Sequence, residues 1–184
     1  MTTIVYSDPN CPFCYATEER LHRLDLADAV QWRGVEHAPD LPVPMQRGTA
    51  HATALGGEVE AIRARAPEVE IAVPAAKPNT AAAIRLGGAA LRRDRAAGRR
   101  FVRSLYRGFW VEGLDISEQA VLERLAVAAG LPDLLVGDED ASLTADWRRQ
   151  WLETGLTGVP LLVRPDGRSV YGLVSEDELR AFLG

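Results

Sequence analysis

The chain has 184 residues, of which 47% are hydrophobic and 26% charged, a composition typical of a folded globular protein and not of a disordered or fibrous one. This length fits one domain, or one domain with a sizeable insertion, and buries an adequate core without disulfides. The net charge of -5 is weak evidence against a nucleic-acid partner, and no apolar run is long enough to cross a membrane. We therefore expect neither nucleic acid nor a membrane as a partner.

The first ten residues, MTTIVYSDPN, contain neither a basic leader nor a long apolar run, which predicts a cytoplasmic protein. The cytoplasm keeps thiols reduced, so a purely structural disulfide is not expected there. The only two cysteines, Cys11 and Cys14, are therefore expected to be catalytic or metal-binding.

The N-terminal segment predicts a strand, a helix and a second strand. The run TTIVYS is rich in β-forming residues and ends at the turn cluster DPN. The following stretch has helical spacing, with Pro12 in the first turn, where its missing N–H costs nothing. Val30 and Trp32 then indicate the second strand.

The middle of the chain is predicted to be helical. From residue 46 to residue 154 nearly every periodic signal has helical spacing, which indicates four or five helices. One helix is expected to begin at Asn79 or Thr80, and Ser117 is expected to cap another. The basic segment RRDRAAGRRFVR is expected to be a solvated helical face, with an anion site as the alternative.

Three aromatic residues, Tyr6, Trp110 and Trp147, fit either of two interpretations. They are consistent with ordinary core packing and equally with a pocket between the helical segment and the rest of the protein.

The C-terminal segment returns to β-structure. Two apolar runs around PDGR predict a hairpin, and Ser175 with Glu178 predicts a capping box on a last helix. The whole order is βαβ, a helical segment, then ββα. We therefore expect an α/β protein in which residues 1–45 and 155–184 form one discontinuous domain and residues 46–154 form a helical insertion.

The segment CPFC carries the chemistry. A Cys-x-x-Cys pair that follows a strand and opens a helix, within a βαβ pattern, is typical of a thioredoxin-like redox site. This spacing brings the two sulfurs close enough to form a disulfide, and the free N–H groups of the helix start favour a thiolate. Cys11 should be the exposed attacking sulfur, and Cys14 the buried resolving one.

The two cysteines allow two other interpretations. A structural zinc site needs four ligands, but the chain has no second cysteine pair, and His22, His37 and His51 show no paired spacing. No metal is therefore expected. Two incidental buried cysteines are the other alternative.

The neighbouring residues bear on the ionisation of Cys11. Pro12 and Phe13 cannot supply the cation that a histidine inside the motif would supply, and Asp8 opposes ionisation if it lies close in space. We predict a Cys11 pKa below the free value of about 8.5 but well above the strongly oxidising extreme of about 3.5. Such a couple favours disulfide reduction or isomerisation over oxidation.

The segment GLTGVP precedes the LLVR strand. In a thioredoxin fold the segment before this strand approaches the cysteines, and a cis proline there leaves backbone groups free to pair with an extended substrate. Pro160 is the candidate for this position. A loop proline that merely starts a strand is the alternative, since only a minority of X-Pro bonds are cis.

The stretches DPNCPFCY, PNTAAAIRL, FWVEGLDISEQAVLERLAVAAGL and TGVPLLV together resemble the DsbA-like thioredoxin-domain family, in which a helical domain is inserted into a thioredoxin fold. Within it the chain looks most similar to the cytoplasmic FrnE-type dithiol–disulfide isomerases or oxidoreductases. The resemblance implies that Cys11 is the nucleophile, that Cys14 is the resolving thiol, and that Val159 and Pro160 form the substrate-facing loop.

The chain also departs from its relatives. FrnE-type sequences commonly have tryptophan and histidine where this chain has Phe13 and Ile84. A more distant resemblance connects it to glutathione-dependent enzymes such as 2-hydroxychromene-2-carboxylate isomerase and kappa-class glutathione transferase. Those usually carry serine at the position of Cys11, which favours redox chemistry here.

These observations predict a thiol–disulfide oxidoreductase. Its substrate would be a disulfide-containing protein or a small thiol compound, contacted by Pro12, Phe13, Val159 and Pro160. No metal or organic cofactor is required, and glutathione or a thioredoxin system would act as reductant. A glutathione-dependent isomerase or transferase, with glutathione as co-substrate, and a non-catalytic redox sensor are the alternatives.

Overall fold

The computed structural model describes residues 2–46 and 48–184, apart from the side chains of residues 49–53. In chain order its elements are β1 (Thr3–Ser7), α1 (Pro12–Arg23), a 3-10 turn (Ala27–Ala29), β2 (Val30–Gly34), α2 (Thr49–Arg65), α3 (Ala81–Arg93), α4 (Arg95–Trp110), α5 (Gln119–Ala128), α6 (Asp138–Glu153), β3 (Leu161–Val163), β4 (Ser169–Tyr171) and α7 (Glu176–Leu183). The predicted order of βαβ, helical segment and ββα is confirmed. None of the described helices is both long and apolar enough to span a membrane.

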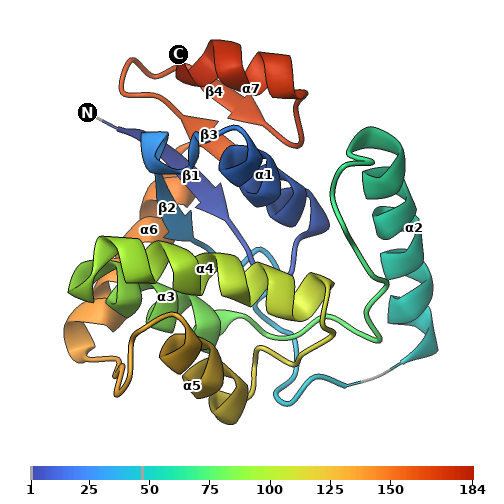
Figure 1. The fold of residues 1–184 in the computed structure, drawn as a ribbon, viewed down its shortest axis with the longest axis vertical. Coiled ribbons are helices and arrows are strands. Elements are labelled where there is room, and N and C mark those ends of the chain that lie inside the picture. Colours follow the sequence, from blue (N-terminus) through green and yellow to red (C-terminus); the bar gives the residue numbers. More distant parts are fainter. Residues whose placement is uncertain (1, 47) are drawn as a thin grey trace.

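One mixed sheet joins the two ends of the chain. Its strand order is β2-β1-β3-β4, with β1 parallel to β2 and antiparallel to β3. Val5 at the middle of β1 lies opposite Trp32 on one side and Leu162 on the other. Because β1 and β3 are antiparallel, the loop before β3 and the segment that follows β1 lie at the same end of the sheet (Figure 1).

Helix α1 begins directly after the turn that follows β1. Cys11 is the N-cap residue with extended backbone angles, and Pro12 occupies the first helical position, where its fixed φ suits the helix. The helix ends before Asp25, whose φ of 56° is left-handed. Both cysteines therefore lie in the first turn of a helix whose start is defined by local sequence.

The helical segment between β2 and β3 packs as a layer of its own. Figure 1 shows α3, α4 and α5 together on one side of the sheet, with α2 standing beside α1. Phe101 and Leu105 of α4 are fully buried. The backbones of α3 and α4 approach closely at Gly98, where a Cβ atom would lie 2.6 Å from the Leu91 nitrogen. A larger residue at this position would force the two helices apart.

The two predicted helix caps have different outcomes. The capping box of α7 is confirmed, because Ser175 Oγ accepts the Glu178 N–H while Glu178 accepts the Ser175 N–H. The predicted Ser117 cap is wrong, since Glu118 is the N-cap of α5. Ser117 instead donates its N–H and its hydroxyl to Asp115 Oδ1, at 2.9 and 2.6 Å. The nearby carboxylate is a charged acceptor, which makes this turn stronger than a neutral cap.

Candidate active site

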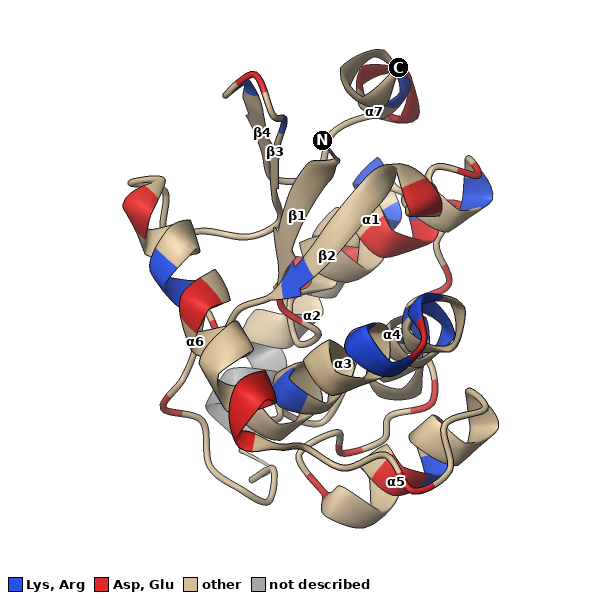
Figure 2. Cartoon of the chain, turned by 90° about the vertical axis from the view of Figure 1, so that its left-hand side faces the viewer, with Lys and Arg blue, Asp and Glu red and all other residues tan. Residues whose placement is uncertain are grey.

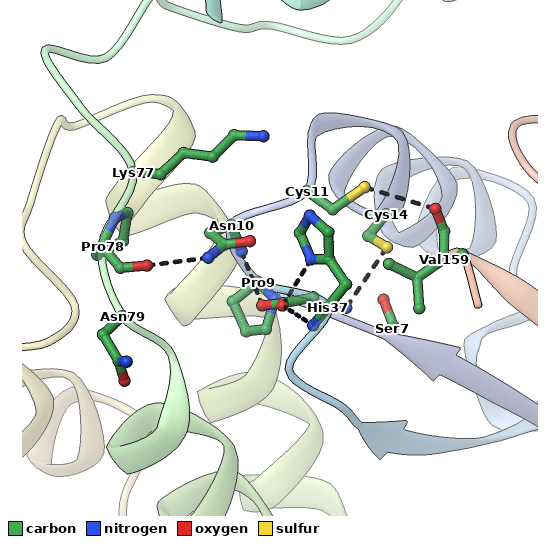
Figure 3. A network of polar contacts seen from close by, with 12 residues as sticks. Ser7, Pro9, Asn10, Cys11, Cys14, His37, Lys77, Pro78, Asn79 and Val159 are labelled. Atoms are coloured by element: carbon green, nitrogen blue, oxygen red, sulfur yellow. Dashed lines mark hydrogen bonds and ion pairs between the residues drawn. The ribbon is translucent and has the colours of Figure 1, made fainter. Parts of the chain in front are cut away.

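Cys11 and Cys14 lie side by side at the start of α1, both as free thiols. Cys14 is buried with 1% of its surface exposed, as predicted. The prediction of an exposed Cys11 is wrong, because only 6% of its surface is accessible. The loop before β3 covers it, and the Cys11 thiol donates to the Val159 carbonyl oxygen at 3.6 Å (Figure 3).

The structure brings the predicted loop residues to the cysteines. Val159 contacts Cys11 through its carbonyl group, and the Val159–Pro160 peptide bond is cis. Pro12 is buried in the first turn of α1. Phe13 is half-buried, with the Arg65 guanidinium 5.7 Å from the centre of its ring.

A histidine from outside the motif stands beside Cys11. His37 follows β2, and its Nδ1 lies 2.7 Å from Oδ2 of Asp8, which also accepts the His37 backbone N–H at 2.9 Å. Asp8 is fully buried, whereas 25% of the His37 side chain is exposed. Figure 3 shows the His37 ring next to Cys11, with its second nitrogen directed away from Asp8. The cation that Pro12 and Phe13 cannot supply thus comes from another element.

The surroundings lower the pKa of Cys11. The hydrogen bond from the Cys14 side chain has the largest effect, burial opposes it, and the Cys14 N–H and the charge of His37 add to the lowering. The charge of Asp8 raises the pKa, as the sequence predicts for a nearby carboxylate. The pKa of His37 is itself raised: burial lowers it, but the hydrogen bond and the charge of Asp8, with that of Cys11, outweigh burial.

The pKa of Cys14 moves in the opposite direction, well above its ordinary value. Burial is the largest cause, followed by the hydrogen bond and the charge of Cys11. Hydrogen bonds from the Ser7 side chain and from the Asp8 N–H lower it in part. Of the two thiols, Cys11 is therefore the one prepared to ionise first and Cys14 the one that keeps its proton.

Comparison with known proteins identifies the family. The model of the DSBA-like thioredoxin domain matches residues 2–184. The chain belongs to this family. Cys11 and Cys14 are accordingly the Cys-x-x-Cys pair of a DsbA-like thiol–disulfide oxidoreductase family, and the predicted α/β thioredoxin fold with a helical insertion is confirmed. No curated protein matches the sequence.

Solved structures share the whole DsbA-like fold. The chain is similar to a protein described as a probable DsbA oxidoreductase from Streptomyces coelicolor, with a TM-score of 0.76 and 23% identity over 100% of this chain and 88% of that one. The cytosolic disulfide reductase DsbM from Pseudomonas aeruginosa, solved with GSH, gives 0.73 and 21% over 100% and 97%. A 2-hydroxychromene-2-carboxylate isomerase gives 0.63 and 17% over 99% and 92%.

Other polar residues near this site of the DsbA-like chain form hydrogen bonds or ion pairs within the protein. Asn79 accepts the Ala81 N–H just before α3, whose N-cap is Thr80, and donates to two backbone carbonyls. Asn10 is fully buried and donates to the Pro78 carbonyl at 2.9 Å (Figure 3). Lys77 Nζ pairs with Glu58 at 2.9 Å.

The basic segment at the end of α3 and in α4 is a solvated face only in part: Arg92, Arg93, Arg95 and Arg100 are exposed, but other arginines of α4 are not. Arg99 is 6% exposed and lies 3.3 Å from Glu18, while Arg103 and Arg107 both pair with Glu19. Figure 2 shows the acidic residues of α1 facing the neighbouring basic helix α4. These three arginines point toward α1 because the carboxylates of Glu18 and Glu19 lie there as their ion-pair partners.

The aromatic residues divide between the two predicted roles. Trp110 is fully buried and stacks on Tyr15. Trp147 lies at the rim of a cavity of about 380 Å³ between β2 and the helices, together with Trp32. The residues that line this cavity do not include the two cysteines.

Proposed function

We propose that this protein is a thiol–disulfide oxidoreductase that reduces or isomerises disulfides, with Cys11 as nucleophile and Cys14 as resolving thiol. The observation that carries the proposal is the opposite direction of their pKa shifts at the start of one helix, lowered for Cys11 and raised for Cys14. Only a thiolate attacks a disulfide, so the lowered pKa supports Cys11 as the thiol that attacks first.

The reaction then follows from thiol exchange. The Cys11 thiolate forms a bond to one substrate sulfur, the substrate S–S bond breaks, and the departing sulfur takes a proton. Cys14 then loses its proton and bonds to Cys11, which releases the second substrate thiol. The dithiol has been oxidised by two electrons, and the substrate disulfide has received them.

Substrate binding is proposed at the loop that covers Cys11. The Val159 carbonyl now accepts the Cys11 thiol and would exchange that contact for a backbone N–H of an extended substrate. Pro160 follows in the same loop, and Pro12 and Phe13 would form the opposite wall. The substrate would be a disulfide-containing polypeptide or a small disulfide.

Return to the dithiol state needs an external reductant. The DsbM neighbour is a cytosolic disulfide reductase solved with GSH, which supports glutathione in this role and a cytoplasmic location. A thioredoxin system could supply the same electrons, and the chemistry requires neither a metal nor an organic cofactor. The reaction is the kind ascribed to the FrnE-type proteins that the sequence resembles.

A glutathione-dependent isomerase is the second candidate, supported by the likeness of the fold to 2-hydroxychromene-2-carboxylate isomerase. Such an enzyme would use Cys11 to orient glutathione and would need no resolving thiol. Cys14→Ser should then leave the activity intact.

The test compares wild type, Cys11→Ser and Cys14→Ser in disulfide reduction with glutathione as reductant. Our proposal expects turnover in the wild type, loss of turnover in Cys11→Ser, and a mixed disulfide that accumulates in Cys14→Ser and is detected by mass spectrometry. Absence of turnover in a wild type whose cysteines still oxidise would identify a redox sensor. Full disulfide reduction in Cys14→Ser would instead overturn Cys14 as the resolving thiol.

A further inference from the structure

A chain of buried polar groups leads to the sulfur of Cys14. The Trp32 indole N–H donates to the Tyr106 hydroxyl at 3.1 Å, and that hydroxyl lies 2.5 Å from Ser7 Oγ. Figure 3 shows the Ser7 hydroxyl facing the sulfur of Cys14, and the Ser7 side chain lowers the pKa of Cys14. All four residues are at most 3% exposed, so water does not compete for these groups.

The chemistry of these groups decides which of them donates and which accepts in each hydrogen bond. An indole nitrogen only donates, so the Tyr106 oxygen is the acceptor of the Trp32 N–H. The Tyr106 proton must then point elsewhere, and within the described part of the chain Ser7 Oγ is its one hydrogen-bonding acceptor. Burial raises the pKa of Tyr106 far above its ordinary value, which keeps the proton in place.

The opposite orientation would leave a donor unsatisfied. If Ser7 donated to Tyr106, the Tyr106 proton would have no acceptor in an apolar interior, which is costly. When Tyr106 donates to Ser7, the hydroxyl proton of Ser7 is directed to the Cys14 sulfur, which it faces in Figure 3. Every donor of the chain is then used.

We propose that Trp32, Tyr106 and Ser7 form a one-directional hydrogen-bond chain that stabilises the Cys14 thiolate during resolution of the mixed disulfide. A second donor assists, because the Asp8 N–H points to the same sulfur at 3.4 Å. The inference rests on the proposed function and assigns positioning residues to its second step.

The step concerned is balanced as follows. Cys14 loses its proton, its sulfur bonds to Cys11, and the bond between Cys11 and the substrate sulfur breaks. The departing substrate thiolate ends with the proton that Cys14 gave up, so no further reactant is needed. Ser7 and the Asp8 N–H hold the negative charge on Cys14 while the new bond forms, in a place where burial opposes that charge.

The two steps can be separated with an aromatic disulfide probe, 5,5′-dithiobis(2-nitrobenzoate), in excess over the reduced protein. Attack by Cys11 releases the first coloured thiolate, and resolution by Cys14 releases the second. Loss of a hydrogen bond to a charged group should slow the second release about tenfold to a hundredfold in Ser7→Ala and in Tyr106→Phe. The first release should be unchanged.

Two further variants complete the design. Ser7→Thr keeps the hydroxyl and should restore the second release. Tyr15→Phe is the matched control, since it removes a phenol hydroxyl that donates to the Glu70 carbonyl and takes no part in the chain. It should leave both releases unchanged.

The outcomes distinguish the inference from the function on which it rests. A normal second release in both folded variants would overturn the inference, as would an equal slowing of both releases. If Ser7→Ala does not fold, Tyr106→Phe alone decides, because it retains the ring. A wild type that gives no second release would instead overturn the proposed role of Cys14.

Discussion

At Cys11, the hydrogen bond from Cys14 and burial have the largest effects on ionisation, and two side chains from outside the Cys-x-x-Cys segment add to them. His37 lowers the pKa of this thiol and Asp8 raises it, while the hydrogen bond between the two side chains fixes the imidazole beside the sulfur. Asp8 thus has two opposite effects on Cys11: its own charge raises the pKa of the thiol, but it also raises the pKa of His37, whose charge lowers that of the thiol. Lys77 is the third charge that acts on this histidine and lowers its pKa.

We predict that His37→Gln reduces the reactivity of Cys11. Glutamine can still donate to Asp8 but carries no charge, so the pKa of Cys11 rises and less thiolate is present at neutral pH. The rate of alkylation by iodoacetamide, followed against pH, should show its midpoint displaced to higher pH and a rate about two- to fivefold lower near neutrality.

His22→Gln provides the control for this measurement, because the His22 ring contacts Glu18 and does not affect Cys11. An unchanged profile in His37→Gln would show that the charge of His37 does not reach the sulfur. A midpoint moved to lower pH would contradict the prediction, because it would mean that His37 raises the pKa of Cys11.

At the scale of single elements, local sequence determines how the helices begin. Helix α7 has its capping box because Ser175 and Glu178 are three residues apart, the spacing at which each side chain reaches the backbone of the other. Helix α1 begins with Cys11 and Pro12 and has no side-chain cap. No side chain of the described residues therefore accepts the N–H groups in the first turn of α1 as a cap, and they remain available to the sulfurs. In α7 the side chain of Ser175 accepts one of these groups.

We predict that Ser175→Ala destabilises the protein by about 1 kcal/mol, the usual cost of losing a helix N-cap. Urea unfolding of the reduced protein measures this free energy. Ser142→Ala is the control, since this exposed serine lies inside α6 and bonds only the preceding turn. Equal effects of the two substitutions would argue that the capping box contributes nothing.

Across the whole molecule, helix α1 is tied to the helical segment by buried charge. Glu18 on α1 is 3% exposed and lies 3.3 Å from Arg99 on α4. Burial raises the pKa of Glu18, but the charges of Arg99, His22 and Arg103 and the His22 hydrogen bond lower it more, so that it is ionised and paired. The helix that carries the cysteines is thus held against α4 through opposite charges (Figure 2).

We predict that Arg99→Met destabilises the fold by about 3 kcal/mol, because the buried charge of Glu18 loses the arginine that lowers its pKa most and keeps only its neighbour His22 in contact. The double variant Glu18→Leu with Arg99→Met should recover most of that loss, since no unpaired charge remains. Urea unfolding of the single and double variants gives both values. Strictly additive losses would contradict a coupled pair, and Arg149→Met, at an exposed pair with Asp146, should have little effect.

Much of this architecture was accessible from the sequence, because it depends on neighbours along the chain. The strand before Cys11, the helix that begins at Pro12, the hairpin around PDGR and the Ser175 cap each follow from residues a few positions apart. The prediction of the Ser117 cap was wrong because Ser117 donates to Asp115 and α5 begins one residue later, and a sequence pattern does not contain the backbone geometry that decides this.

The spacing of Cys11 and Cys14 is local, so it was enough to predict two thiols at the start of a helix in a βαβ unit. The groups that surround the thiols come from distant parts of the chain. His37 reaches Asp8 across 29 residues, Tyr106 reaches Ser7 across 99, and Val159 covers Cys11 from 148 residues away. Burial and electrostatic fields are sums over residues that the sheet and the helical layer bring together, so the ionisation of each sulfur is a property of the fold.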